Sequence, residues 1–325
     1  MKIKDRICGE NKILEPIIVE IINGPTLQRL KEIDQIGYFE PHFPGTAHSR
    51  FEHSVGVYLL LKKYGANLTE QIAGLIHDVS HSAFSHCIDY VLNTDSEKDQ
   101  SHQDSVHDGF VKKSEIPSIL KKYNINLEYI LDDKNFPLKE RELPDLCADR
   151  IDYSLRTAVI FKEIADASYF LENLVVNEKR WVFKTTEGAK KYAKLFKELN
   201  SKYYAGLQSA AMFASVGDYL KYAVSKKYIS KKDLYTTDKL VLSKIAPHLN
   251  SDEKLNLLFS RMSGKTNFRN NPKSFDRDVF CKSRAVDPLC FHNGVVKHIS
   301  EIDEHWGITL KIESKPKHYF IKFAK

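Results

Sequence analysis

The stretch AGLIHDVSHSAFSH, residues 73–86, decides the fold of this chain. It opens as the apolar end of a helix that we expect over residues 68–78, with Thr69 as the N-cap. His77 and Asp78 are neighbours at the end of this helix, and neighbours on a helix point about 100° apart. Both can reach one ion only if the ion lies beside the helix between them, or if other helices supply the remaining ligands.

The sequence before this stretch predicts further helices. Apolar residues recur at helical spacing over residues 50–64, which predicts a helix that carries His53. A shorter helix is expected near Asn23, which is a good N-cap, with Pro25 in its first turn. The intervening residues 37–49 hold two glycines and two prolines and are expected to form a loop.

Histidines gather in this part of the chain. Eight of the 13 lie between positions 42 and 107, far more than an even distribution predicts. They are His42, His48, His53, His77, His81, His86, His102 and His107. We expect His42 and His48 to be solvated in the Pro/Gly-rich loop and His107 to lie on the surface.

A metal site is one interpretation of part of this cluster. His53 lies on the preceding helix and Asp149, in ADRIDY, on a later one. With His77 and Asp78 they would supply four ligands from three helices. Two imidazoles and two carboxylates suit Mn, Fe, Co, Ni or Zn, with Mg as a further possibility. The alternative is that the His77-Asp78 pair only caps the C-terminus of its helix.

The same stretches resemble a known family. IINGPTLQRLKEIDQIG (21–37), FPGTAHSRFEHSVGV (43–57), AGLIHDVSHSAFSH (73–86) and DRIDYSLR (149–156) are similar to the HD-domain metal-dependent phosphohydrolases. The similarity is closest to the dNTP triphosphohydrolase branch of the SAM-and-HD-domain type, without the SAM domain. It covers roughly residues 10–160, and the order and approximate spacing of the stretches agree.

The resemblance implies a role for each matching residue. It places His53, His77, Asp78 and Asp149 around the metal, and Arg50 on a phosphate. It implies that His81, His86 and His102 line the phosphate channel and that one of them protonates the leaving oxygen. Tyr153 would pack against the sugar, Gln35 and Ile36 would meet the sugar hydroxyls, and Thr157 would contribute to the same pocket.

The chain also departs from the family pattern. Gln103 follows the channel histidine where the family has a glutamate, and an amide cannot act as a carboxylate base. Thr157 replaces an aspartate that helps to hold the 3′-hydroxyl. Asn23 and Lys31 stand where nucleotide-activated relatives bind guanine, so a GTP-type activation site is not expected.

Beyond the motifs, the pattern predicts a mainly α protein. Helical runs are expected at 109–123, 144–161 and 186–227, with an irregular polar segment at 93–107. We expect a mobile basic loop at 262–278 and a small sheet from VFCKSRAVDPLCF, WGITLKIE and HYFIKFAK. The fold class is therefore an HD-domain helical core at 1–230, followed by a smaller α+β appendage at 231–325.

Composition bounds the remaining questions. With 49 Lys and Arg against 43 Asp and Glu, the formal net charge is +6, which permits an anionic ligand without establishing one. The mean hydropathy of −0.40 and the absence of a long apolar run argue against a membrane span. Five widely spaced cysteines and a polar N-terminus favour free thiols and a cytoplasmic location.

Three hypotheses for function follow. The first is a metal-dependent phosphohydrolase that converts a (d)NTP to nucleoside plus triphosphate. The second is a phosphomonoesterase or a hydrolase of another nucleotide. The third is an HD protein with little turnover that binds nucleotides, or single-stranded nucleic acid through a basic loop at 262–284. The resemblance also implies a homo-oligomer.

Overall fold

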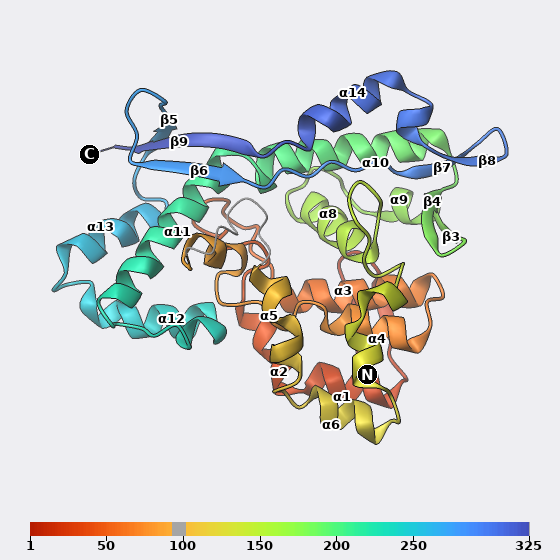
Figure 1. Ribbon diagram of the computed structural model, residues 1–325, viewed down its shortest axis with the longest axis horizontal. Helices are drawn as coiled ribbons and strands as arrows, with labels where there is room; N and C mark the ends of the chain where they lie inside the picture. The colour runs from red at the N-terminus through yellow and green to blue at the C-terminus, as the bar shows by residue number, and fades with distance from the viewer. Residues whose placement is uncertain (93–101, 325) are drawn as a thin grey trace.

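The first 230 residues form mostly helices, and one buried helix among them carries His53. This computed structural model describes residues 1–92 and 102–324. The helix that carries His53 is α3 (Arg50–Lys63); it is buried along most of its length, and α4 (Leu68–Ile76) and α8 (Ala148–Ile160) pack against it (Figure 1). Because α3, α8 and the end of α4 carry the four predicted metal ligands, their packing determines the geometry of the site.

Local signals explain where α3 begins. Ser49 and Glu52 form a capping box, in which the Ser49 hydroxyl accepts from the Glu52 amide and the Glu52 carboxylate accepts from the Ser49 amide. This satisfies two backbone N–H groups that lack partners within the helix. The predicted helix at 50–64 is confirmed to within one residue.

Two predicted N-caps were wrong. The side chain of Asn67 caps α4 by accepting from the Glu70 amide, whereas the Thr69 hydroxyl donates to Asn67. The helix thus starts one residue before Thr69. Asn23 is the last residue of α1 (Pro16–Asn23), and Gly24 is the N-cap of α2 (Pro25–Arg29).

The later helices fall close to the predicted runs. α6 (Ile116–Lys122) and α8 lie within them, but the run at 186–227 is divided into α10 (Thr186–Leu199) and α11 (Leu207–Ser225) by a π-helical turn at Asn200–Tyr204. Gly206 follows this turn because a Cβ there would clash with the carbonyl of Lys202.

The segment predicted to be irregular differs from the expectation. Residues 102–107 belong to α5 (His102–Val111), so the prediction was wrong for them. The remainder, 93–101, lies outside the described residues.

A four-stranded sheet joins the two halves of the chain. Its order is β3 (Leu174–Asn177), β4 (Arg180–Phe183), β7 (Leu289–His292) and β8 (Val295–His298), with β4 and β7 parallel and the other neighbours antiparallel. The β4–β7 pairing crosses the predicted boundary between residues 230 and 231. That boundary stays a prediction.

A three-stranded antiparallel sheet occupies the C-terminal region, in the order β5 (Phe268–Asn270), β9 (Lys317–Phe323), β6 (Arg277–Cys281). The expectation of a loop over 262–278 was therefore partly wrong, since this range includes β5 and the start of β6. The other elements are β1 (Lys2–Asp5), β2 (Gly9–Lys12), α7 (Leu127–Leu131), α9 (Ser168–Asn173), α12 (Asp238–Ile245), α13 (Glu253–Met262) and α14 (Glu304–Glu313).

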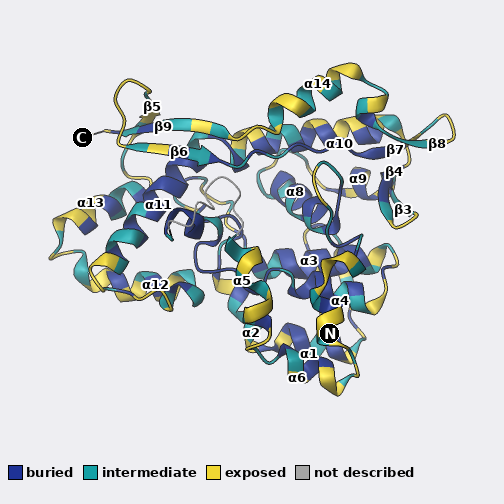
Figure 2. Cartoon of the chain, in the orientation of Figure 1, coloured by how far each residue is buried: buried dark blue, intermediate teal, exposed yellow. Residues whose placement is uncertain are grey.

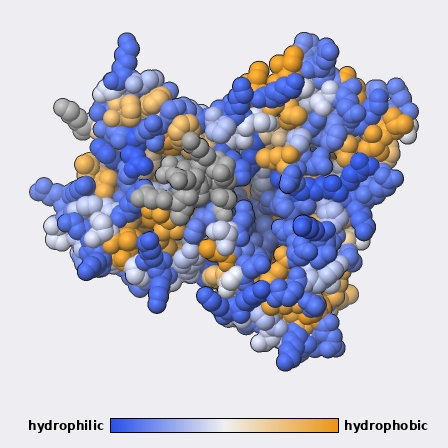
Figure 3. All heavy atoms as spheres, viewed as in Figure 1, coloured by the Kyte–Doolittle hydropathy of each residue, from blue (hydrophilic) through white to orange (hydrophobic). Residues whose placement is uncertain are grey.

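The predicted strand WGITLKIE is instead part of α14. Its apolar residues alternate, which is typical of a strand, but Asp303 accepts from the amides of His305 and Trp306 and so starts a helix. As a result Ile308 and Ile312 are exposed on the outer face. Hydrophobic atoms are visible there in the upper right of Figure 3.

The fold class is mainly α with an α+β C-terminal region, as expected. Buried residues concentrate on the inward faces of the helices (Figure 2). All five cysteines are free thiols. Within the described residues, none of the helices combines the length and the apolar character needed to cross a membrane. The cytoplasmic location stays a prediction.

Gly56, in the middle of α3, gives a stability prediction. Gly→Ala within a helix normally adds up to about 1 kcal/mol of stability. At Gly56, however, a Cβ would clash with the buried side chains of Arg156 and Asp152. We expect Gly56→Ala to lower the free energy of unfolding by about 1–3 kcal/mol in urea titrations.

Gly109 on α5 is the matched control for this substitution. A Cβ at Gly109 meets no atom within 4 Å, so Gly109→Ala should be neutral or stabilising. Equal stability of the Gly56→Ala variant and the native chain would contradict the packing described here.

Candidate functional site

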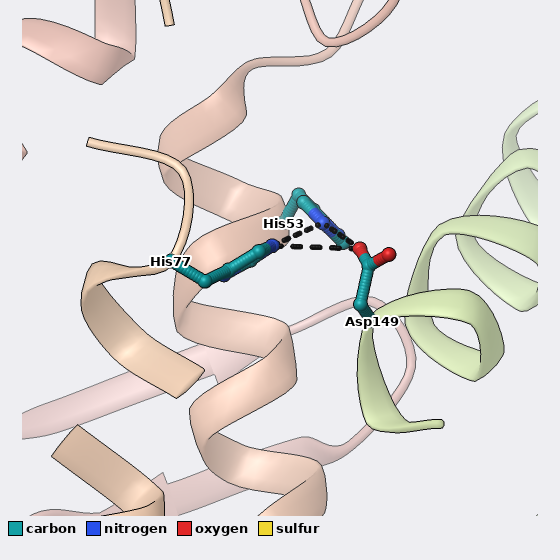
Figure 4. A group of neighbouring side chains, drawn as sticks. All are labelled: His53, His77 and Asp149. Atoms are coloured by element: carbon teal, nitrogen blue, oxygen red, sulfur yellow. Dashed lines mark hydrogen bonds and ion pairs between the residues drawn. The ribbon is translucent and has the colours of Figure 1, made fainter. Parts of the chain in front are cut away.

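Three side chains from separate helical elements converge on one point (Figure 4). His53 comes from α3, His77 follows the last residue of α4, and Asp149 comes from the first turn of α8. The Nε2 atoms of the two histidines are 3.2 Å apart, and Asp149 Oδ1 lies 2.8 Å from His53 Nε2 and 3.4 Å from His77 Nε2.

The outer nitrogens of both imidazoles are occupied by acceptors. His53 Nδ1 lies 2.8 Å from Asp152 Oδ2, and His77 Nδ1 lies 2.7 Å from the carbonyl oxygen of Gly74. Carboxylates and carbonyls only accept hydrogen bonds, so each Nδ1 carries its proton. In the neutral rings both Nε2 lone pairs then face each other and the Asp149 carboxylate.

Such a group of acceptors requires a cation. Burial alone lowers the pKa of His53, but its hydrogen bonds to Asp149 and Asp152 raise that pKa to about 9, so a proton is held there. A divalent cation is the alternative. Ligands that bind one ion at about 2.0–2.2 Å and at right angles are about 3 Å apart, which matches the spacing of these donors. The donor set thus fits a metal ion.

Asp78, the fourth predicted ligand, lies beside this group. Its Oδ1 is 3.4 Å from His77 Nε2 and its Oδ2 is 3.6 Å from His53 Nε2. The carboxylate accepts from Arg50 Nη1 at 2.6 Å and lies 3.3 Å from His81 Nε2. Burial alone raises the pKa of Asp78, but Arg50 and the neighbouring histidines hold it well below its usual range.

A cavity of about 520 Å³ opens at this group. Two of the converging donors, His77 and Asp149, line it together with Asp78. This volume accommodates a small organic ligand, because such sites usually measure about 300–1,000 Å³.

Most of the residues implied to bind substrate line this cavity. They are Gln35, Ile36, Arg50, His81, His86, Tyr153 and Thr157. Several of them hold buried polar atoms without a hydrogen-bond partner among the described residues, including Gln35 Oε1, Arg50 Nη2, His81 Nδ1 and the Tyr153 hydroxyl. Buried polar groups are normally paired, so these atoms are suited to a bound ligand.

The two channel histidines His81 and His86 lie together, with ring centroids 5.2 Å apart. Burial, and then the Arg50 guanidinium, lowers the pKa of His81 to about 4 and that of His86 well below its usual range. Both rings are therefore neutral near pH 7 in the absence of an anion.

The positions of His102 and His107 differ from the expectation, which placed His102 in the channel and His107 on the surface. Among the described residues that line the cavity, His102 is absent, and its Nε2 lies 2.8 Å from the Tyr235 hydroxyl. Gln103 and His107 line the cavity instead. They are four residues apart on α5 and share one face, whereas His102 is turned about 100° away from Gln103. The surface position expected for His107 was wrong.

Both polar atoms of the Gln103 side chain have partners inside the protein. Its Nε2 donates to the His77 carbonyl at 3.1 Å, and its Oε1 accepts from the Ser80 hydroxyl at 3.3 Å. It therefore positions the turn that carries His77.

His42 and His48 were also expected at the surface, and both are buried. His42 Nε2 lies 3.0 Å from the carbonyl oxygen of Met262, and His48 Nδ1 lies 3.0 Å from that of Thr46. Each ring bonds to a backbone carbonyl that the sequence pattern does not reveal.

Sequence reasoning missed several residues of the site. Asp152 orients His53, and its position three residues after Asp149 in DRIDYSLR was an available signal. Lys139 and Arg150 line the cavity, as do Lys282 and Arg284 from the C-terminal region. The last two had no local signal that connects them to the histidines.

Several known proteins are similar to this chain in sequence or structure. The family model of the HD domain matches residues 50–157. The uncharacterized protein YdhJ of Bacillus subtilis is 34% identical over 100% of this chain and 97% of its own length. The metal-dependent phosphohydrolase cns2 of Cordyceps militaris is 40% identical over 50% of this chain and 46% of its own.

A relative that matches over a shorter stretch is the deoxynucleoside triphosphate triphosphohydrolase SAMHD1 of Homo sapiens, which is 43% identical over 27% of this chain and 16% of its own length. The chain thus matches less than half of both cns2 and SAMHD1. Among solved structures, a phosphohydrolase from Bacteroides thetaiotaomicron has a TM-score of 0.73 at 16% identity, with 100% of both chains covered. At this identity the likeness shows the fold alone.

Proposed function

The chain belongs to the HD-domain family, and from this we propose that it is a metal-dependent phosphohydrolase that acts on a nucleotide. The observation that carries the proposal is the convergence of His53, His77 and Asp149 at a cavity that Arg50 also lines. Two relatives support it, the metal-dependent phosphohydrolase cns2 and the deoxynucleoside triphosphate triphosphohydrolase SAMHD1.

In this proposal His53, His77 and Asp149 hold the metal, with Asp78 beside them. When bound, a divalent cation at these donors draws charge from a phosphoryl oxygen and makes a water molecule more acidic. Asp152 and the Gly74 carbonyl orient the two imidazoles, as outer partners of metal-binding histidines commonly do.

Arg50 would bind a substrate phosphate. Its Nη1 donates to Asp78 and its Nε donates to Ser85, while its Nη2 has no hydrogen-bond partner among the described residues. His81 and His86 lie next to this guanidinium. A phosphate bound there adds negative charge, which favours protonation of an imidazole and would prepare it to protonate the leaving oxygen.

The most specific form of the proposal is hydrolysis of a (d)NTP to nucleoside plus triphosphate. Its support is the similarity to SAMHD1 and the cationic side chains that line the cavity. Two departures favour a second candidate, a phosphomonoesterase. Gln103 bonds to backbone and hydroxyl groups in place of a carboxylate relay, and Thr157 carries no charge for the 3′-hydroxyl.

A substrate panel tests the proposal. Purified protein loaded with Mn²⁺, Co²⁺ or Fe²⁺ should hydrolyse nucleotides, and chromatography of the products separates triphosphate from monophosphate release. Preference for nucleoside monophosphates would select the second candidate. Self-association and binding to single-stranded nucleic acid stay predictions.

Metal removal gives a direct prediction. Dialysis against a chelator should lower hydrolysis by at least about 100-fold, because the crowded acceptors alone cannot activate water, and added divalent metal should restore it. Elemental analysis before and after dialysis monitors the metal content. Undiminished turnover by metal-free protein would contradict the proposal.

A further inference from the structure

Two cations from the C-terminal region reach the cavity of the HD site. Lys282 and Arg284 lie in the irregular segment between β6 and β7, yet both line the cavity together with Arg50. They belong to the stretch at 262–284 that was expected to be a basic loop on the surface. Their position separates them from the rest of that stretch.

The backbone explains why both side chains point the same way. Burial alternates from Val279 to Arg284: Val279, Cys281 and Ser283 are buried, and the residues between them are partly exposed. This is the pattern of an extended chain, in which residues two apart share a face. Lys282 and Arg284 therefore share the face that borders the cavity.

The segment is held in place from its other side. The Ser283 hydroxyl accepts from Asn200 Nδ2 at 2.9 Å and donates to the Glu313 carbonyl at 2.5 Å. Asn200 Oδ1 accepts from the Arg284 backbone amide at 3.0 Å, and Asn200 is fully buried. These bonds anchor the backbone that carries the two cations to the π-helical turn after α10 and to the end of α14.

The charges of both cations influence the pKa values of other residues that line the cavity. The Arg284 charge acts on His86, Tyr153 and Tyr204, which all line the cavity. The Lys282 charge acts on Asp104, which lines it from α5. These charge effects agree with the position of both cations in the cavity wall.

Arg50, Lys139 and Arg150 also line the cavity, and each lies beside a carboxylate. Arg50 pairs with Asp78, Lys139 with Asp133, and Arg150 lies 3.5 Å from Glu140. Asp104 and Asp108 also line the cavity, so its lining carries both positive and negative groups, and an anion is repelled by some of them. An anion with several charged groups gains most by reaching both Arg50 and the segment that carries Lys282 and Arg284.

We propose that Lys282 and Arg284 form a polyphosphate-binding subsite that extends the HD site toward the C-terminal region. The proposal rests on the proposed function for its substrate class, a nucleoside polyphosphate. Same-side residues on an extended chain are about 7 Å apart, so two long cationic side chains can grip one phosphate chain at two points. The subsite selects polyphosphates over small phosphomonoesters.

The first experiment measures binding of inorganic tripolyphosphate by calorimetry. The variant Lys282→Gln with Arg284→Gln should bind tripolyphosphate about 10- to 100-fold more weakly than the native chain, because charge-assisted hydrogen bonds are lost. Lys265→Gln with Arg269→Gln is the matched control, since both residues are exposed and belong to the same basic stretch. Restoring charge with Lys282→Arg and Arg284→Lys should recover most of the affinity.

The second experiment separates substrate classes. For a nucleoside triphosphate the Gln variant should raise KM by about 10-fold or more with kcat largely retained, and its kcat/KM for p-nitrophenyl phosphate should fall much less than that for the triphosphate. Thermal unfolding confirms that the variant folds.

The outcomes distinguish this inference from the proposed function. Unchanged tripolyphosphate binding in the Gln variant, or an equal loss in the Lys265/Arg269 control, would overturn the subsite. A chain that hydrolyses no nucleotide but loses tripolyphosphate binding only in the Lys282/Arg284 variant would overturn the proposed function and support the subsite.

Discussion

A variant that carries both His77→Ala and Asp149→Ala should lose its bound metal and at least about 1,000-fold of its hydrolytic rate, because two of the three converging donors are removed. Only His53 then remains of the group. Asp149 is a better second site than Asp78, because loss of Asp78 would also release Arg50. An effect on metal binding could then not be separated from an effect on phosphate binding. Elemental analysis and initial rates measure the two effects.

His305→Ala is the control for this variant. His305 is an exposed histidine at the start of α14, so its removal should change neither metal content nor rate. The double variant should also remain folded without metal, because it relieves the crowding of acceptors around His53. Normal metal content together with normal turnover in the double variant would end the metal-site interpretation.

Arg156→Ala should lower the free energy of unfolding by about 3–5 kcal/mol, since it leaves buried carboxylates without their cation. Arg156 is fully buried on α8 and donates to both carboxylate oxygens of Asp152, at 3.0 and 2.9 Å, and to Asp5 at 2.8 Å. Asp152 also holds His53, so metal affinity should fall in the same variant. Urea titration measures the stability, and metal titration measures the affinity.

Arg180→Ala provides the comparison on the surface. Arg180 pairs with exposed Glu178 at 3.0 Å, and such pairs contribute only about 0–1 kcal/mol. Arg156→Lys should fall between the two, because lysine keeps the charge but cannot form the two-pronged contact with Asp152. A loss for Arg156→Ala no larger than that for Arg180→Ala would show that the buried network does not stabilise the fold.

The sequence was most informative where the signal is local. The helix from Arg50 was predicted correctly because its apolar residues recur at helical spacing within a few turns of chain. The candidate metal residues were found through their motifs, and the structure brings His53, His77 and Asp149 together. For α14 the prediction was wrong. Its alternating apolar residues favoured a strand, but the Asp303 side chain caps a helix, and the alternation of apolar residues does not reveal that cap.

The cavity wall is the part that sequence could not supply. Whether His102 or His107 faces the site depends on the rotation of α5, which is set by packing against other helices. Lys282 and Arg284 come from a segment whose place is determined by hydrogen bonds to Asn200 and Glu313.

By itself the sequence determined the helical class, the family motifs and which residue types could bind a metal, because these depend on neighbours along the chain. Only the tertiary structure decided which side chains share the cavity and that Asp152 orients His53. Those choices depend on contacts between segments far apart in sequence, and periodicity within one segment carries no record of such contacts.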